Sequence, residues 1–440
     1  MDAEGTFKIS WEWESAPGVR LPEHKATWAR IEIRAGQDFI TLVEDLDSGS
    51  SRRSIYAPLY PLAEWIAFNW WKLLFNSRLS RPELVSRFDR ARLTDPELLR
   101  NNFRRIGDGF AWPDLAFIPA GEQTTISWRP YSSPVANWRI RYIGHGDATV
   151  ASTELQVELS RIVNSVISRL DECGLGATSL HKEWAAVTGA DVDEAQYCRT
   201  AARLGLDPYS EAHEFENEII SASQNLTPDL FGDFVDAVSP AKIQESQGWV
   251  SQAAAKVEGI TAPRRNLLTE EMRAVLSKYR SGPSTRPWET GWEQAKIARQ
   301  IAQVPSAERF QLGEFVSTQE LTSPEPRIHA LGRRRGGGAA LVVGASQAHA
   351  KTKNFLIGRA LWHSVTDDDA PFLITGAYTE KQKIERAFAA ELLAPAAGIS
   401  QLLDADPWSA SLESVERIAE HFEVSAVLVQ HQMDNQLVVK

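Results

Sequence analysis

Strand-like alternation of apolar and polar residues marks the first third of the chain. Successive side chains of a strand point to opposite faces, so this alternation predicts half-buried strands. A helix is expected at Leu62–Phe75, where apolar residues recur at helical spacing directly after Pro61, a residue suited to a helix start. Residues 1–150 therefore predict an aromatic-rich mixed β/α domain. The expected strands are Phe7–Trp13, Thr27–Arg34, Phe39–Asp45, Arg53–Ala57, Thr124–Pro130 and Asn137–Tyr142, the last two as a hairpin.

Apolar residues at a period of 3.6 dominate the next segment, as in helices that bury one face. Gly205 follows one of these patterns and is suited to the left-handed conformation that ends many helices. The patterns predict a helical domain over residues 151–280, followed by a linker, Ser281–Pro287, rich in Ser, Gly and Pro. The expected helices are Ser152–Cys173, Asp191–Leu204, Phe215–Gln224 and Leu230–Ala237.

The last part, residues 288–440, combines helices with strand. Ala339–Val343 is a short apolar run of the kind found in buried strands. Arg333–Gly338, three Arg followed by three Gly, is expected to form a mobile loop before it. The chain as a whole is therefore predicted to be α+β. The expected helices are Trp288–Ala302, Asn354–Val365, Glu380–Leu393, Leu412–Phe422 and Ser425–Asn435.

Composition and charge narrow the classes of function. A net charge of −11 argues against broad non-specific binding to nucleic acid or to an anionic membrane. Two cysteines, Cys173 and Cys198, fit a reducing compartment and allow no CxxC metal pattern. The sequence begins without the basic and apolar regions of a signal peptide, and it has no apolar run long enough to span a membrane. We therefore expect a cytoplasmic protein with no membrane partner.

Two short segments in the last part carry the most specific signal. Phe388–Pro395 reads F-A-A-E-L-L-A-P, and an earlier helix contains R-A-L-W-H at Arg359–His363. Together with the later segment Ile418–Ser425, and in this order, they resemble the ImmA/IrrE family of metallopeptidases and metallopeptidase-like regulators. The resemblance covers residues 288–440. It implies a zincin-like fold for that domain.

The resemblance also implies a zinc site, in degenerate form. In the family, H-E-x-x-H on a helix supplies two His ligands on one face and a Glu as general base. Here Arg359 occupies the position of the first His and Ala360 that of the Glu, and only the second His, His363, is present. The third ligand, a Glu on the following helix, falls on Gln382 in the family register. We therefore expect a pseudo-metallopeptidase with no catalytic residue and no cofactor, zinc being expected only if the site is rearranged.

Several side chains near these segments have two interpretations. We expect Arg359 to form an ion pair with Glu385 or Glu391 that fills the place of the metal. His363 is either a hydrogen-bonded core residue or a weak metal-ligand candidate, together with Glu385. Glu391 is expected to face solvent or to be a structural partner. Asp367–Asp369 is expected to be a solvated loop rather than a cation site.

Positive charge is concentrated at Arg333, Arg334 and Arg335, which are candidates for binding a protein partner or a nucleic-acid backbone. The alternative is an exposed, solvated loop. Ser414–Asn435 has the spacing of a helix-turn-helix, but its second helix has no Arg or Lys. Because groove binding usually needs cations that contact phosphate, we interpret this segment as a packing element.

Three functions remain open at the level of sequence. The resemblance favours a bacterial regulatory or defence-related protein that binds a partner protein, such as a helix-turn-helix repressor or an antitoxin. A second hypothesis is an active zinc metallopeptidase with rearranged ligands that cleaves such a repressor. A third is a nucleic-acid-binding scaffold that uses the N-terminal sheet domain or the three arginines, in which the C-terminal domain only assembles a complex. The rearranged ligands of the second hypothesis are His363, Glu380 or Glu385, and His329 or His349.

Overall fold

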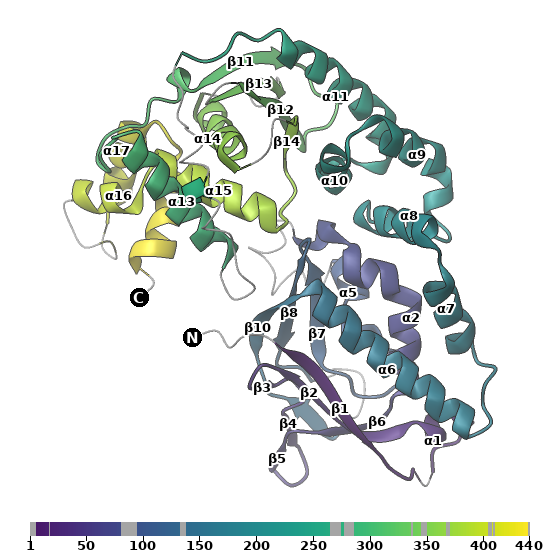
Figure 1. Ribbon diagram of the computed structural model, residues 1–440. Helices are drawn as coiled ribbons and strands as arrows, with labels where there is room; N and C mark the ends of the chain where they lie inside the picture. Colours follow the sequence, from purple (N-terminus) through teal and green to yellow (C-terminus); the bar gives the residue numbers. More distant parts are fainter. Residues whose placement is uncertain are drawn as a thin grey trace. The chain divides into compact units, whose positions relative to one another are not determined.

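The computed structural model has a mixed α+β fold that divides into two compact units, Met1–Glu214 and Phe215–Lys440 (Figure 1). Each unit has its own hydrophobic core. Within the described part of the chain, no helix is both long and apolar enough to cross a membrane. The structure describes residues 6–16, 18–80, 95–132, 138–264, 274–276, 286–335, 338–344, 350–366, 370–403, 407 and 410–438.

Three small sheets build the strand part of the first unit. In the first sheet β2 pairs antiparallel with β1, β3 and β6, and Ile9 of β1 lies opposite Ile33 of β2 in the core. The orders of the other two are β10-β8-β7 and β5-β4-β9. The strands are β1 (Phe7–Trp13), β2 (Trp28–Ala35), β3 (Asp38–Phe39), β4 (Val43–Asp45), β5 (Ser51–Arg52), β6 (Ile55–Pro58), β7 (Asp114–Pro119), β8 (Gln123–Arg129), β9 (Ile140–Tyr142) and β10 (Gly146–Ala151).

The expected hairpin between Thr124–Pro130 and Asn137–Tyr142 is wrong in its strand pairing. Strand β8 pairs with β7 and β10, whereas β9 pairs with β4. Among the described residues, Tyr131 after β8 and Tyr142 at the end of β9 form an antiparallel bridge. Strand β7 has all six residues buried, so it lacks the alternation by which a half-buried strand is recognised.

The helices of the first unit pack into the same core as its strands. Helix α6 buries Leu155, Leu159 and Ile162 in that core, and Trp70 of α2 meets the ring edge of Trp184 of α7 with centroids 5.0 Å apart. Gly205 ends α8 with φ +78°, as its sequence context predicts. The helices are α1 (Pro22–Ala26), α2 (Tyr60–Phe75), α5 (Pro96–Arg100), α6 (Ser152–Glu172), α7 (Ser179–Gly189) and α8 (Val192–Arg203), with 3-10 turns at Ser77–Ser80, Phe103–Arg105 and Ala212–Phe215.

The segment expected as a helical domain, residues 151–280, is shared between the two compact units. Helices α6, α7 and α8 belong to the first unit, and α9, α10 and α11 to the second. The division into independently folding domains 1–150, 151–280 and 288–440 stays a prediction.

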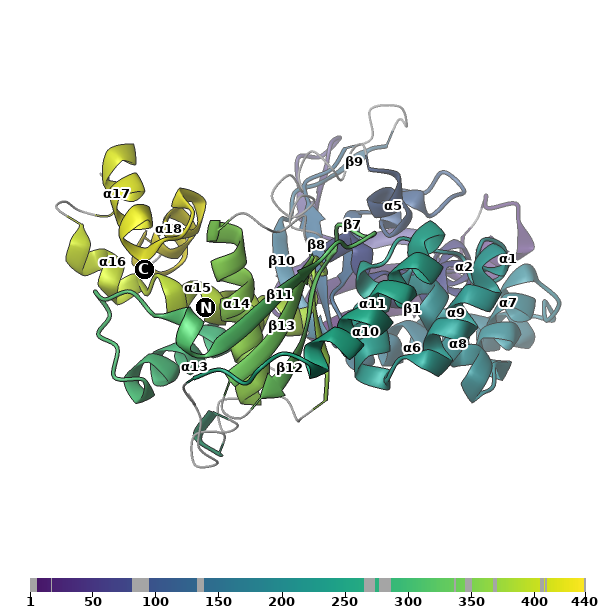
Figure 2. The same cartoon turned by 90° about the horizontal axis from the view of Figure 1, so that it is seen from above.

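A four-stranded sheet lies at the centre of the second unit, in the order β11-β13-β12-β14. Only the β11–β13 pair is parallel. Helix α14 packs on one face of this sheet and α11 on the other (Figure 2). Since both faces are covered, every residue of β13 is buried. The strands are β11 (Val316–Leu321), β12 (Ile328–Arg335), β13 (Gly338–Gly344) and β14 (Phe372–Thr375).

Helices make up most of the remaining described part of the second unit. Helix α15 carries the F-A-A-E-L-L segment and packs between α13 and α14. The helices of this unit are α9 (Glu216–Asn225), α10 (Pro228–Ala237), α11 (Ile243–Glu258), α13 (Pro287–Ile301), α14 (Ala350–Thr366), α15 (Glu380–Leu393), α16 (Ala396–Leu402), α17 (Leu412–Phe422), α18 (Ala426–Gln432) and a π-helical end, Met433–Val438, with further 3-10 turns at Pro240–Lys242 and Leu312–Glu314.

Two glycines let α15 approach its neighbours closely. A Cβ on Gly291 of α13 would lie 2.4 Å from the carbonyl oxygen of Ile384, and one on Gly358 of α14 would lie 3.1 Å from the Cβ of Ala389. Phe388 is fully buried between these contacts. The small and apolar residues of the F-A-A segment are therefore explained by packing.

The expectation of a mobile loop at Arg333–Gly338 is wrong for the residues that the structure describes. Arg333–Arg335 are the last residues of β12, and Gly338 is the first of β13. Gly336 and Gly337 lie outside the described residues. A Cβ on Gly338 would lie 2.1 Å from the carbonyl oxygen of Phe315, so glycine is required where β13 begins.

Candidate functional site

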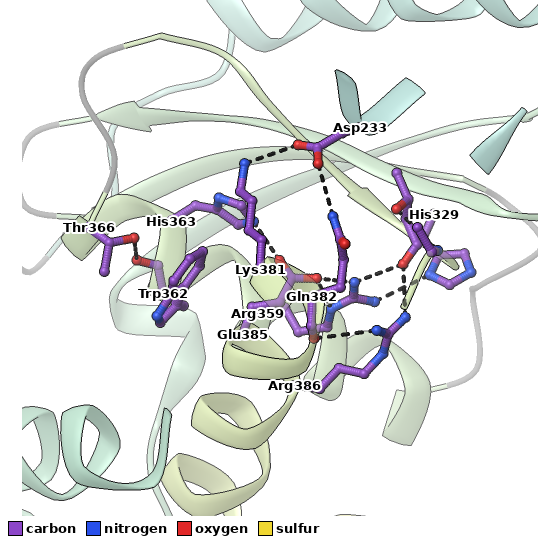
Figure 3. A network of polar contacts seen from close by, with 12 residues as sticks. Asp233, His329, Arg359, Trp362, His363, Thr366, Lys381, Gln382, Glu385 and Arg386 are labelled. Carbon is purple, nitrogen blue, oxygen red and sulfur yellow. Dashed lines mark hydrogen bonds and ion pairs between the residues drawn. The ribbon is translucent and has the colours of Figure 1, made fainter. Parts of the chain in front are cut away.

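The R-A-L-W-H segment lies in the middle of α14 and faces α15. Arg359 and His363 are one helical turn apart, so both side chains lie on the same face of α14. They meet the carboxylate of Glu385 on α15 (Figure 3). Arg359 donates from Nε to Oε1 at 2.9 Å and also from Nη2 to the same oxygen, while His363 Nε2 lies 2.5 Å from Oε2. The expected ion pair with Glu385 is confirmed.

Burial makes this ion pair unusual. Arg359 is 2% exposed, His363 1% and Glu385 0%. Burial alone would raise the pKa of Glu385, but the charge of Arg359 and the hydrogen bond from His363 outweigh it and lower that pKa to about 2. Glu385 is therefore an ionised carboxylate with both oxygens in use.

Aromatic neighbours fix the ring of His363. Phe372 of β14 stacks on it with centroids 4.3 Å apart and an interplanar angle of 8°. The adjacent Trp362 meets the ring edge-on and donates its indole N–H to Gln294 of α13 at 2.8 Å. Of the two interpretations of His363, these contacts support the hydrogen-bonded core residue.

A β-bulge brings His329 to the same centre. Along β12 and β14, Ile328 lies opposite Thr375 and Ala330 lies opposite Ile374, so His329 is the extra residue between them. Its Nδ1 lies 3.4 Å from Nη1 of Arg359. Burial and the charges of Arg359 and other arginines lower the pKa of His329 to about 3. The ring is therefore neutral at physiological pH and accepts from Arg359.

Gln382, at the position that the family register gives to a metal ligand, has two other partners. Its side-chain oxygen accepts from the backbone N–H of Thr379 at 3.2 Å in a capping box that starts α15. Its amide nitrogen donates to Asp233 of α10 at 2.9 Å. Lys381 donates to the other oxygen of Asp233 at 3.0 Å. Burial raises the pKa of Asp233, and the charges of Lys381 and His363 oppose that shift.

Glu391 is a structural partner and does not face solvent. It is 1% exposed and accepts from the backbone N–H of Ala396 at 3.2 Å. Gln432 and Gln436 each donate to the same oxygen at 2.8 Å. Burial raises the pKa of Glu391, and these hydrogen bonds oppose that shift. The carboxylate therefore fastens the C-terminal helices to the end of α15.

Two of the three arginines proposed for binding contact helix α11. Arg333 and Arg335 both donate to the carboxylate of Glu258 at the end of α11. Their hydrogen bonds lower the pKa of Glu258. Arg334 lies between them on β12. All three are part of a strand and lie on the same strand as His329, beyond Gly332.

The donor set does not fit a zinc ion. The guanidinium group of Arg359 is a fixed cation that occupies lone pairs of Glu385 and His329, and His363 contacts the other oxygen of Glu385. Ala360 is fully buried and carries no group that can accept a proton. Among the described residues, no three His, Cys, Asp or Glu side chains are grouped as metal ligands. His349 and Asp367–Asp369 lie outside the described residues.

Other members of the centre were missed by sequence reasoning. Asp233 joins from α10, the carbonyl oxygen of Thr375 from β14, and Arg386 from α15 (Figure 3). Arg386 donates to the Thr375 carbonyl at 3.2 Å, one turn from Gln382. Of these three residues, Arg386 alone could have been suspected from the sequence, because it directly follows Glu385.

Comparison with known proteins adds no relative to this picture. No protein-family model matches the sequence, and the searches of curated proteins and of solved structures each gave no significant match.

Proposed function

We propose that residues 288–440 form an ImmA/IrrE-like pseudo-metallopeptidase domain with a zincin-like frame and no bound zinc. In this proposal the protein is a bacterial regulatory or defence-related factor. It binds a partner protein, such as a helix-turn-helix repressor or an antitoxin, without cleaving it.

The observation that carries this proposal is the ion pair between Arg359 and Glu385. Arg359 lies one helical turn before His363. Its guanidinium group contacts His329 and the carboxylate of Glu385, which His363 also contacts. The permanently charged guanidinium group thereby binds the carboxylate and imidazole groups that would otherwise be available to a divalent metal ion. This arrangement supports a centre that is closed to metal.

The groups that peptide hydrolysis needs besides the metal are also missing from α14 and α15. A metallopeptidase needs a metal-bound water and a general base beside it. Ala360 occupies the position of that base, and the amide of Gln382 is engaged with Asp233 and with the start of α15. The packing around Phe388 and Glu391 is nevertheless complete. A complete frame without reactive groups supports binding in place of catalysis.

Metal content is the first test. The full chain is purified without added metal or chelator, and its zinc is measured by elemental mass spectrometry beside a His363→Ala variant. We expect well under one zinc per chain in both. About one zinc in the wild type, lost in His363→Ala, would overturn the proposal and favour the rearranged metallopeptidase.

The fate of a partner is the second test. Cross-linking pull-down of the full chain from cells that encode it is followed by mass spectrometry of the captured proteins. Capture of an intact helix-turn-helix protein supports binding without cleavage. A captured protein that is consistently shortened, and intact with His363→Ala, contradicts the proposal.

A further inference from the structure

Two guanidinium groups converge on one carbonyl oxygen in the centre of the second unit. Arg359 donates from Nη2 to the oxygen of Thr375 at 2.8 Å, and Arg386 donates from Nη2 to the same oxygen at 3.2 Å. Arg386 also donates to the backbone oxygen of Gln382 at 3.3 Å and lies over the ring of Tyr378, 5.2 Å from its centroid. Two like charges are thus held together by a neutral acceptor.

Among the described residues, a single carboxylate serves both arginines. Glu385 pairs with Arg359 and is also the carboxylate that acts most strongly on Arg386. Within the part of the chain that the structure describes, the hydrogen bonds of Arg386 go to two backbone oxygens. A guanidinium group has five N–H donors, so most of those on Arg386 remain for another acceptor. The centre therefore has a surplus of positive charge and of donors.

Neighbouring groups add to this surplus. Arg327, directly before β12, donates toward the backbone oxygen of Gly376 at 3.5 Å and adds positive charge at His329 and Arg386. His329 accepts from Arg359 through Nδ1, so the neutral ring carries its proton on Nε2 and is a donor there. Arg386 and His329 are both partly exposed, whereas Arg359 is buried beneath them. The surplus therefore reaches solvent at the end of β14.

We propose that Arg386, His329 and Arg359 form a binding site for an oxyanion group, a carboxylate or a phosphate, at the end of β14. Arg386 contacts the oxyanion directly through its free N–H groups, and His329 donates from Nε2. Arg359 supplies charge from below. Planar guanidinium groups match both carboxylate and phosphate geometry, which is why the two share one site.

Electrostatics gives such a ligand a source of binding energy. Burial and the charge of Arg359 lower the pKa of Arg386 to about 9, which means that its charged form is disfavoured where it stands. An anion at the site would relieve this cost. The oxyanion site is built from contacts and charges of these side chains, so it does not depend on the partner protein of the proposed function.

The test is isothermal titration calorimetry on the full chain with two probes. Inorganic phosphate represents a free anion, and an acetylated, amidated tri-glutamate peptide represents the carboxylates of a partner protein. Arg386→Gln removes the direct contact. Arg333→Gln is the matched control, because it removes a partly exposed arginine of the same sheet that is paired with Glu258.

We expect the wild type to bind at least one probe and Arg386→Gln to bind it about tenfold or more weakly, with Arg333→Gln unchanged. Tighter binding of phosphate identifies a free anion as the ligand, and tighter binding of the peptide identifies a partner's carboxylates. If Arg386→Gln does not fold, Arg386→Lys replaces it and is expected to weaken binding severalfold, since it keeps charge without the planar fork. No binding of either probe up to about 10 mM, or equal loss in the Arg333→Gln control, overturns the inference.

Discussion

The guanidinium group of Arg359 and the carboxylate of Glu385 form an ion pair in which neither side chain is more than 2% exposed. Removing one partner of such a pair leaves a buried charge without its counter-charge, which costs about 3–5 kcal/mol. Arg359→Met should therefore lower the free energy of unfolding by an amount near the lower end of that range, because His363 still contacts Glu385.

A double-mutant cycle measures the coupling directly. Urea unfolding is followed for Arg359→Met, Glu385→Gln and the double variant. The double variant should lose less stability than the two single losses added together, since each single change strands the other group. Additive losses would mean that the two groups do not stabilise each other.

The free energy of unfolding should decrease as the pH is lowered, over a range set by the pKa of His329. Its pKa is lowered from 6.5 to about 3 in the folded protein, so between these values the unfolded state binds a proton that the folded state does not. Stability from this group is therefore complete above pH 6.5 and is lost as pH falls toward 3. The lowered pKa of Glu385 acts in the same direction, over the range from 4.5 down to about 2.

His329→Gln separates the two windows, because it removes only the upper one. The free energy of unfolding, measured by denaturant titration from about pH 7 to about pH 5, should decline less steeply in this variant than in the wild type. Parallel curves would show that the pKa of His329 is the same in the folded and unfolded states.

The close helix crossing at Gly291 should be intolerant of any side chain. A Cβ there would lie 2.4 Å from a backbone oxygen of α15, so Gly291→Ala must push two helices apart and should cost about 1–3 kcal/mol or more. Gly248 of α11 is the matched control, with no atom within 4 Å of its Cβ position. Gly248→Ala should stabilise by up to about 1 kcal/mol. Thermal or urea unfolding decides, and a similar effect at both glycines would contradict the packing argument.

Glu391 should control the order of the C-terminal helices. Glu391→Ala removes the acceptor shared by Gln432, Gln436 and the backbone N–H of Ala396, at a cost of about 1–3 kcal/mol. Hydrogen exchange should become faster in α18 while β13 keeps its protection. Glu391→Gln, which retains an oxygen acceptor, should be milder. Unchanged exchange in α18 would show that these hydrogen bonds are dispensable.

Elements with clear periodicity and caps could be predicted from sequence. Helices α15 and α17 and strand β1 have the predicted bounds, and Ser411 caps α17 by accepting from the N–H of Ser414. Strand β7 could not be recognised in this way, because it is buried on both faces and its residues do not alternate. Arg333 and Arg335 looked like part of a loop because their partner, Glu258, lies on a helix that is far away in the sequence.

In the candidate site, too, some contacts could be predicted from the sequence and others depend on the folded chain. The contact of Arg359 with Glu385 could be predicted because two helices with known facing sides bring the residues together. Asp233 could not, since only the folded chain brings it to Gln382. The surplus charge at Arg386 depends on Arg359 of α14 and on Arg327 before β12, and it was likewise beyond sequence reasoning.

The two hydrogen bonds of Gln382 bear on how this chain could change over evolutionary time. An amide can serve Thr379 with its oxygen and Asp233 with its nitrogen, whereas a carboxylate has no donor for Asp233. Gln382→Glu alone would set two buried carboxylates against each other. An acidic residue at 382 therefore requires an earlier or simultaneous change at 233, 149 positions away in the chain. Asp233 thus restricts which residues position 382 can acquire by a single mutation.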